Sequence, residues 1–214
     1  MKDSAVALLI DVVSSRSGDR AALHQALQDA AAVANERHPA VDPLRPTVGD
    51  ELQGVYSTLG DALAASYTFR LALAPRWDAR VGIGGGAVEV VDSDLGIQDG
   101  SAWWLAREAI DWVKEQAHRK GYESARTAIR DGRRADGASS SDSRVADALT
   151  RLIDAHVARL KPGVVESLKG VLSGEDNAAV ADRLGISASA NSQRVINNDL
   201  RVVADAIAAL GHLR

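Results

Sequence analysis

Residues 5–10, a run of six consecutive aliphatic side chains near the N-terminus, constrain the fold more than any other segment. The run contains no polar residue and stops at Asp11. It is too short for a membrane span or a typical amphipathic helix, and its composition is typical of a fully buried strand. We therefore expect a sheet in which this strand is buried and Asp11 lies where the strand ends.

The segments that follow predict an α+β domain. Ser17 or Asp19 can cap a helix that runs to about Glu36, because apolar residues recur there at helical spacing. The next signals are a hairpin, a helix, a strand, a helix and a strand, and the first six elements follow the split β-α-β order of ferredoxin-like folds. We predict a ferredoxin-like antiparallel sheet with helices on one face. The expected ranges are 44–48 and 52–56 for the hairpin, then 58–73, 79–91, 101–119 and 123–130.

A change of composition divides the chain in two. Residues 131–143 are rich in Gly, Arg, Asp and Ser, and only helical patterns follow them. We predict an α+β domain over 1–132, a linker over 133–143 and an all-α domain over 144–214. The helices expected in the second domain are 144–160, 162–172, 177–184 and a long one over 187–210.

The composition excludes several kinds of chemistry. The 214 residues include no Cys, so there is no disulfide, no thiolate zinc site and no cysteine nucleophile. The five His residues are scattered without metal-ligand spacing, which leaves carboxylates as candidate metal ligands. A net charge of −4 gives no general attraction to nucleic acid, so a DNA-binding surface would be local. We find no signal-peptide or membrane-span pattern, and we expect a cytoplasmic protein without membrane partners.

Two aspartates are the candidate metal ligands. Asp11 ends the buried strand, and Asp50 lies in the turn of the predicted hairpin. In a split β-α-β sheet the first strand lies beside that hairpin, so both carboxylates can converge at one sheet edge and attract Mg²⁺. Glu51 could assist. The alternative is that Asp50 serves the turn and Asp11 caps the next segment.

A glycine-rich segment at residues 80–88 has the spacing of a dinucleotide fingerprint, with Gly82, Gly84 and Ala87 at the key positions. A true fingerprint turns from a strand into a helix. Here the sequence continues as strand through Val91, so we reject this interpretation. The glycines more simply allow backbone or ligand to approach the sheet closely.

Four segments resemble class III nucleotide cyclase catalytic domains in order and spacing: 9–13, 47–50, 80–84 and 100–107. The resemblance implies a cyclase-type or palm-type sheet, Mg²⁺ bound by Asp11 and Asp50, and a transition-state contact from Arg107. Because the sites of that family form between two subunits, it also implies a homodimer. The nucleotide contacts that it implies here are Ser14, Ser15, Gly49, Arg45 and Trp103.

Two positions depart from the cyclase pattern. Trp103 replaces the asparagine that the family carries one helical turn before Arg107, and the base-reading lysine falls at Pro46, with Arg45 beside it. The departures affect the catalytic step and the base contact rather than the metal-binding carboxylates. An alternative for Trp103 and Arg107 is simple packing on the sheet and a surface ion pair.

Nearly the whole chain resembles the SatD family of bacterial proteins. It shares an Asp-x-x-x-Ser opening at residues 11–15, the Gly-Asp hairpin at 49–50, and an Asp-Gly-x-Ala…Ala-Arg-Glu-Ala segment at 99–109. This resemblance extends through the C-terminal helices.

Residues 178–195 have the pattern of a helix-turn-helix. Ala181 is small where the two helices would cross, Gly185 allows the turn, Ile186 can fill the core, and Ser187 can cap the second helix. This pattern predicts a compact pair of helices, of the kind that places its second helix in the major groove of DNA.

The same segment resembles the helix-turn-helix of sigma-factor region 4. The resemblance implies that Ser189, Ser192, Gln193 and Arg194 face DNA, while Asn191 stands where an apolar residue normally docks the second helix. The C-terminal region has as many acidic as basic residues, unlike most DNA readers. The alternative is a three-helix module for dimerisation or partner contact.

Three hypotheses for function follow. The first is a transcriptional regulator of the SatD type that binds or senses a nucleotide and binds DNA. The second is an Mg²⁺-dependent, cyclase-like enzyme acting on nucleoside triphosphates, with a regulatory helical tail. The third is a catalytically inactive interaction scaffold. A homodimer is expected under the first two.

Overall fold

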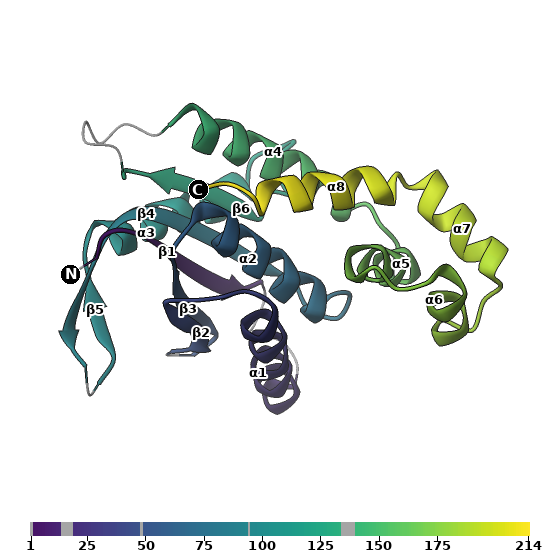
Figure 1. Ribbon diagram of the computed structural model, residues 1–214, viewed down its shortest axis with the longest axis horizontal. Coiled ribbons are helices and arrows are strands. Elements are labelled where there is room, and N and C mark those ends of the chain that lie inside the picture. Colours follow the sequence, from purple (N-terminus) through teal and green to yellow (C-terminus); the bar gives the residue numbers. More distant parts are fainter. Residues whose placement is uncertain (1, 14–18, 48, 94, 134–139) are drawn as a thin grey trace.

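The computed structural model describes residues 2–13, 19–47, 49–93, 95–133 and 140–214, which form six strands and eight helices (Figure 1). The N-terminal α+β region and the all-helical C-terminal region are both present. The first comprises β1 (Lys2–Val12), α1 (Arg20–Arg37), β2 (Asp42–Pro46), β3 (Glu51–Tyr56), α2 (Leu59–Leu73), β4 (Ala79–Asp92), β5 (Ile97–Asp99), α3 (Ser101–Gln116) and β6 (Thr127–Asp131). The second comprises α4 (Ser141–Val157), α5 (Pro162–Ser173), α6 (Asn177–Arg183), α7 (Ala188–Asn197) and α8 (Leu200–Leu210).

The sheet places β1 between β3 and β4, as a fully buried strand requires. The strands run in the order β2-β3-β1-β4 with antiparallel pairing throughout, and this chain order of strands and helices agrees with the prediction. The prediction of a purely antiparallel sheet is wrong, because β6 pairs in parallel with β4. Helix α3 returns the chain along the sheet between these two strands, so β6 starts at the same end as β4. The sheet is therefore mixed.

Helices cover both faces of the sheet, which corrects the prediction of helices on one face. Side chains of β1 alternate: Val6, Leu8 and Ile10 pack into the core under α1 and α2, whereas Ala7 and Leu9 pack with α3. A strand that is aliphatic on both faces exposes apolar surface unless each face is covered. The uninterrupted aliphatic run at residues 5–10 carried this signal.

The glycines of β4 allow α3 to lie directly on the sheet. A Cβ atom added at Gly82 would overlap the carbonyl oxygen of Ala106, and one at Gly84 would overlap that of Ala102. The strand continues to Asp92 without turning into a helix, so the rejection of the dinucleotide fingerprint is confirmed. The close approach that we expected is to the backbone of α3.

Beyond the glycines, β4 extends past the sheet and pairs with the short strand β5 to form an arm, at the lower left of Figure 1. Strand β5 was not predicted, because it has only three residues and its sequence carries no alternation of apolar and polar residues. We call residues 89–99 the β4–β5 arm.

The C-terminal helices differ from the prediction in one respect. The long helix expected over 187–210 is two helices, α7 and α8, because the chain turns at Asp199, which has a left-handed backbone with φ of 51°. Asp and Asn adopt this conformation more readily than other non-glycine residues, and Asn197 and Asn198 precede Asp199. The turn directs α8 back towards the sheet.

Helix α8 joins the C-terminal region to the α+β region. Ile207 and Leu210 of α8, and Ile153 of α4, belong to the same apolar core as Leu63 of α2. The backbone N–H of Gly60 donates a hydrogen bond to the carbonyl oxygen of Leu213 at 2.8 Å. The two regions thus share one core in this structure.

The division into 1–132, 133–143 and 144–214 stays a prediction. Helix α4 begins at Ser141 and is capped by the hydroxyl of Ser140, so the helix starts inside the predicted linker. Residues 134–139 of that linker lie outside the described residues. Among the described residues, no helix is long and apolar enough to cross a membrane.

Candidate functional site

Asp11 lies at the end of β1 between two strands that carry charged residues. It pairs in register with Glu51 of β3 and with Arg80 of β4. Its carboxylate is 3.5 Å from Nη1 of Arg80 and 3.3 Å from Nζ of Lys114, which reaches down from α3. Asp11 is half-buried and is held by two cations on the face of the sheet that α3 covers.

Arg107 of α3 forms a two-pronged ion pair with Glu51. Nη1 and Nη2 each donate to one carboxylate oxygen at 2.8 Å. These hydrogen bonds raise the pKa of Arg107, and burial partly opposes the rise. Arg107 and Asp11 are therefore neighbours across Glu51, and the arginine that the cyclase resemblance singles out is placed over the end of β1.

Asp50 faces a different part of the molecule. It lines a cavity of about 250 Å³ together with Leu23 and Leu27 of α1, whereas Asp11 faces α3. No group of three or more His, Asp or Glu side chains that could hold a metal is gathered within the described ranges. The two predicted ligands are not gathered at one point in this arrangement, because Asp11 is ion-paired and Asp50 is turned towards α1. Magnesium binding by these two aspartates stays a prediction.

A second cavity, of about 480 Å³, opens beside Arg107. It is lined by residues of four elements: Leu9 of β1, Glu51 and Gln53 of β3, Gln98 of β5, and Trp103, Trp104 and Arg107 of α3. The indole N–H of Trp103 and Oε1 of Gln98 are buried here, and neither has a hydrogen-bond partner among the described residues. The exposed Trp104 donates its N–H to Asp99 at 2.8 Å. The cavity thus combines aromatic surface, a guanidinium and unused hydrogen-bonding atoms.

The other predicted nucleotide contacts are not gathered at this cavity. Nη2 of Arg45 donates to the carbonyl oxygen of Gly96 at 3.3 Å, so Arg45 joins β2 to the β4–β5 arm. Gly49 lies in the hairpin turn with φ of +76°. Ser14 and Ser15 lie outside the described residues, so their predicted roles are not placed.

Helices α6 and α7 are joined by a short turn where the sequence pattern predicts a helix-turn-helix. Gly185 adopts φ of +64° in the turn, and the hydroxyl of Ser187 accepts a hydrogen bond from the N–H of Ala190 at 3.1 Å. Val180 and Val195 are buried between the helices and α5. The start of each helix and the glycine turn agree with the sequence pattern.

Asn191 docks α7 through hydrogen bonds instead of apolar contact. The residue is 2% exposed, its Oδ1 accepts from the hydroxyl of Ser167 at 2.7 Å, and its Nδ2 donates to Oδ1 of Asn177 at 3.0 Å. Both polar ends of the side chain are therefore satisfied, which explains how a polar residue occupies this position.

The four predicted DNA-reading residues divide into two pairs. Ser189 and Gln193 are exposed on α7. Ser192 is half-buried and lines a cavity towards α5 and α6, and Nη1 of Arg194 donates to the carbonyl oxygen of Gly163 at 3.1 Å. Only the first pair is free to contact another molecule without rearrangement.

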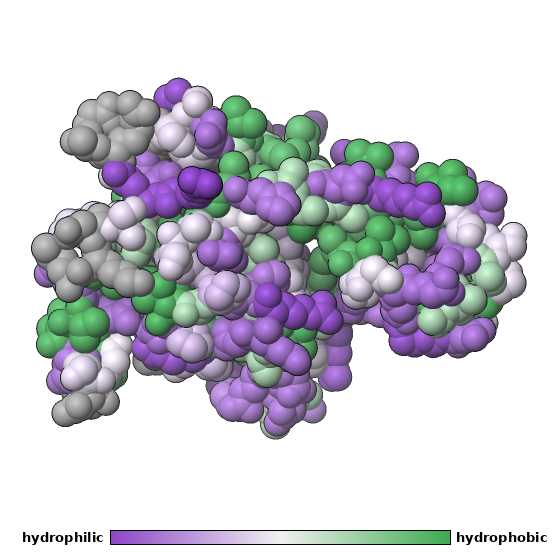
Figure 2. All heavy atoms as spheres, viewed as in Figure 1, coloured by the Kyte–Doolittle hydropathy of each residue, from purple (hydrophilic) through white to green (hydrophobic). Residues whose placement is uncertain are grey.

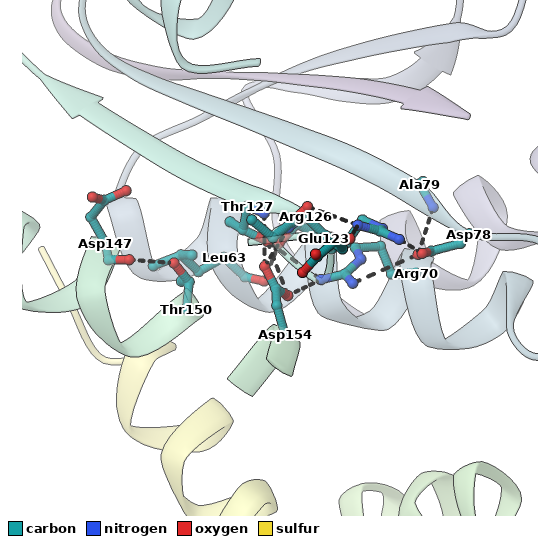
Figure 3. A network of polar contacts seen from close by, with 12 residues as sticks. Leu63, Arg70, Asp78, Ala79, Glu123, Arg126, Thr127, Asp147, Thr150 and Asp154 are labelled. Atoms are coloured by element: carbon teal, nitrogen blue, oxygen red, sulfur yellow. Dashed lines mark hydrogen bonds and ion pairs between the residues drawn. The ribbon is translucent and has the colours of Figure 1, made fainter. Parts of the chain in front are cut away.

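A buried ionic network lies between α2, β6 and α4 (Figure 3). The sequence patterns did not predict it. Arg70 of α2 pairs with Asp154 of α4, and Oδ2 of Asp154 accepts the backbone N–H groups of Arg126 and Thr127 at 2.9 and 2.8 Å. Burial opposes the charge of Arg70, but Asp154 and Asp78 raise its pKa overall. A single charged residue within residues 62–73, a stretch otherwise free of charge, was the available signal.

These features define a class of protein: a mixed six-stranded α+β region whose core continues into a C-terminal all-helical region. A model of the SatD family matches residues 5–205, and the chain belongs to that family. No curated protein matches the chain.

Proposed function

We propose that the protein is a DNA-binding regulator of the SatD type whose α+β region binds a nucleotide. The observation that carries the proposal is the exposed side of α7. Ser189 and Gln193 point away from the packed helices there and can donate and accept hydrogen bonds at base edges. A helix-turn-helix that presents its second helix in this way can place it in the major groove.

Two cations near α7 support DNA binding. His156 at the end of α4 contacts the carbonyl oxygen of Asn198 at 2.9 Å, and Gly163 at the start of α5 accepts from Arg194. The connection between these two contact points carries Arg159 and Lys161, so both lie near the C-terminal end of α7. Both side chains are exposed and have no ion-pair partner in the described part of the chain. They are suited to contact phosphates, which supply most of the affinity for DNA.

The cavity beside Trp103 supports nucleotide binding. Its volume of about 480 Å³ is within the range of small-molecule sites, and its aromatic walls can stack against a planar base. Nε1 of Trp103 and Oε1 of Gln98 are buried without a hydrogen-bond partner among the described residues, so a side-chain movement that exposes them would supply one donor and one acceptor to a ligand. Arg107 lines the same cavity, and it would contact a phosphate once its ion pair with Glu51 opens.

A homodimer belongs to the same proposal. The β4–β5 arm projects from the body of the molecule, and Figure 2 shows hydrophobic residues gathered on it. Val90, Val91, Leu95 and Ile97 are each between 48% and 72% exposed. Exposed apolar side chains that cluster in this way mark interaction surfaces. A second copy of the chain would give a DNA reader the two half-site contacts that such proteins use.

Catalysis is not part of the proposal. The carboxylate of Asp11 is paired with two cations and Arg107 is paired with Glu51, so neither group is free in this arrangement. Incubation with nucleoside triphosphates and Mn²⁺, followed by chromatography, tests the enzymatic alternative. Formation of a cyclic product would show that the protein is an enzyme of the cyclase type.

Selection of bound duplexes from a random DNA pool, followed by gel-shift titration at several salt concentrations, tests DNA binding. Gln193→Ala should weaken binding to the selected sequence, whereas Gln25→Ala on α1 should not. Lys161→Gln should reduce the slope of log affinity against log salt by about one, and Lys120→Gln, which removes an exposed lysine elsewhere, should leave it unchanged. If no duplex is bound, the DNA-binding proposal is wrong and the helix-turn-helix is a module for protein contact.

Calorimetric titration with ATP and GTP in the presence of Mg²⁺ tests nucleotide binding. Gln98→Ala should weaken binding if the base occupies the cavity beside Trp103. Asp50→Asn tests the metal prediction separately, because Asp50 does not line this cavity. No heat for any nucleotide would remove the nucleotide half of the proposal and leave the DNA half intact.

A further inference from the structure

A large cavity lies where the two regions meet. It has a volume of about 650 Å³, is open to solvent on one side, and is lined by residues of α1, α2, α5, α6 and α8. Figure 2 shows a hollow with hydrophobic residues around it between α2, α5 and α8. Leu71, Leu172 and Ile207 line it, with the small side chains of Ala64 and Ala208 leaving the space open. A cavity of this size and lining is typical of a site for a small molecule with an apolar body.

The edge of the cavity carries cations that are only partly neutralised. Lys169 and Arg183 line it, and they pair with Glu166 at 2.6 and 3.4 Å; Arg183 also pairs with Glu175 at 2.9 Å. Arg37, in the last turn of α1, lines the same cavity. Three cations against two carboxylates leave one positive charge in excess.

That excess charge belongs to Arg37. The residue is exposed, and its side chain has no hydrogen-bond or ion-pair partner in residues 2–13, 19–47, 49–93, 95–133 and 140–214. The neighbouring His38 already has a hydrogen-bond partner, because its Nε2 is 2.7 Å from the hydroxyl oxygen of Thr68. A ligand with one negative charge would therefore find a free guanidinium at the edge of an apolar chamber.

We propose that this cavity binds an amphipathic monoanion, a carboxylate that carries an acyl chain or an aromatic body. The apolar body lies against α2, α5 and α8, and the carboxylate pairs with Arg37. The walls come from both regions, and Arg183 at the end of α6 belongs to the helix-turn-helix. The ligand therefore bridges the α+β region and the helix-turn-helix. The proposal depends neither on nucleotide binding nor on DNA binding.

Calorimetric titration of the full chain with decanoate, below the concentration at which it forms micelles, tests the proposal. Decanoate should bind with one molecule per chain. Decanol, which has the same tail without the charge, should bind about ten-fold more weakly, because the charge-assisted contact to Arg37 is lost. Acetate, which has the charge without the tail, should give no measurable binding.

Matched variants locate the site. Arg37→Gln should weaken decanoate binding about ten-fold and leave decanol unchanged, whereas Arg144→Gln, which removes an exposed arginine of α4, should change neither. Ala208→Trp should block both ligands by filling the cavity. Ala72→Trp provides the same block from α2 if the first variant does not fold.

Four results would overturn the proposal. The first is no binding of decanoate. The second is equal affinity for decanoate and decanol, which would remove the role of the charge. The third is decanoate binding that survives both tryptophan variants. The fourth is decanoate affinity that is the same in Arg37→Gln and Arg144→Gln. In the last two cases the ligand would occupy another place.

Discussion

The carboxylate of Asp154 in α4 is 0% exposed and pairs with Arg70 of α2, which lies across the interface between the helical and α+β regions. The same carboxylate accepts two backbone N–H groups at the start of β6. The guanidinium of Arg70 and the two backbone N–H groups thus depend on one side chain of the C-terminal region.

Replacement of Asp154 by Ala should destabilise the protein strongly. The change leaves the buried guanidinium of Arg70 without its main partner, and breaking one side of a buried ion pair costs about 3–5 kcal/mol. Urea unfolding followed by circular dichroism measures the free energy of unfolding. Asp142→Ala, at an exposed position in the first turn of the same helix, should cost about 1 kcal/mol or less; equal losses would contradict the assigned role of Asp154.

Addition of a methyl group at Gly84 should also destabilise the protein. Gly84→Ala forces a Cβ into the backbone of α3, and overpacking of this kind costs about 3 kcal/mol. In Gly49→Ala the added Cβ meets no neighbouring atom. The only cost is that alanine must adopt a left-handed backbone conformation, which lowers the free energy of unfolding by about 1 kcal/mol. Thermal unfolding of the two variants separates these effects, and a Gly84→Ala protein as stable as the parent would mean that α3 does not lie this close to β4.

Asn191→Ala should destabilise the helix-turn-helix, because Ser167 and Asn177 lose the partner that satisfies them in a buried place. The expected cost is about 1–3 kcal/mol. Asn197→Ala, at an exposed position of the same helix, serves as the control and should have little effect. Hydrogen exchange of the backbone amides in α6 and α7 measures the local loss of stability. An unchanged protection pattern in Asn191→Ala would contradict the prediction.

Stability should fall under mildly acidic conditions in a way that depends on His38. Burial lowers the pKa of His38, Arg37 lowers it further, and Asp61 partly opposes them. The unfolded chain then binds the proton more readily than the folded chain. This group therefore contributes no pH dependence above the unfolded pKa of about 6.5, and it destabilises the fold as the pH drops below that value.

Urea unfolding at a series of pH values between about 7.5 and 5 measures this effect. His38→Gln should flatten the part of the profile that His38 causes. His118→Gln, at an exposed position, provides the comparison, and identical profiles for the parent and His38→Gln would show that His38 does not contribute.

The fold could be predicted from the sequence where the pattern is local. The aliphatic run of β1, the order of elements through β4, and the glycine turn before α7 were all visible in short windows. The parallel pairing of β6 and the position of α3 could not be predicted in this way, because both depend on which face of the sheet a distant helix covers. The break at Asp199 was missed because the apolar spacing continues across it.

The candidate site was less predictable than the fold. Spacing placed Asp11 and Asp50 at one edge of the sheet but could not tell which side chain turns towards α1 and which towards α3. The pairing of Arg107 with Glu51 joins residues that are 56 positions apart. The partners of Asn191 and Arg194 lie on other helices, so exposure on α7 could be assigned only from the packed structure.

The return of α8 to α2 has a consequence for synthesis on the ribosome. Helix α8 follows every other helix and strand of the structure, yet Ile207 and Leu210 complete the core beneath α2. The apolar side of α2 therefore stays uncovered while the α+β region has already left the exit tunnel. A nascent chain stalled before α4 should bind chaperones that recognise exposed apolar segments, and it should lose them once residue 210 has emerged.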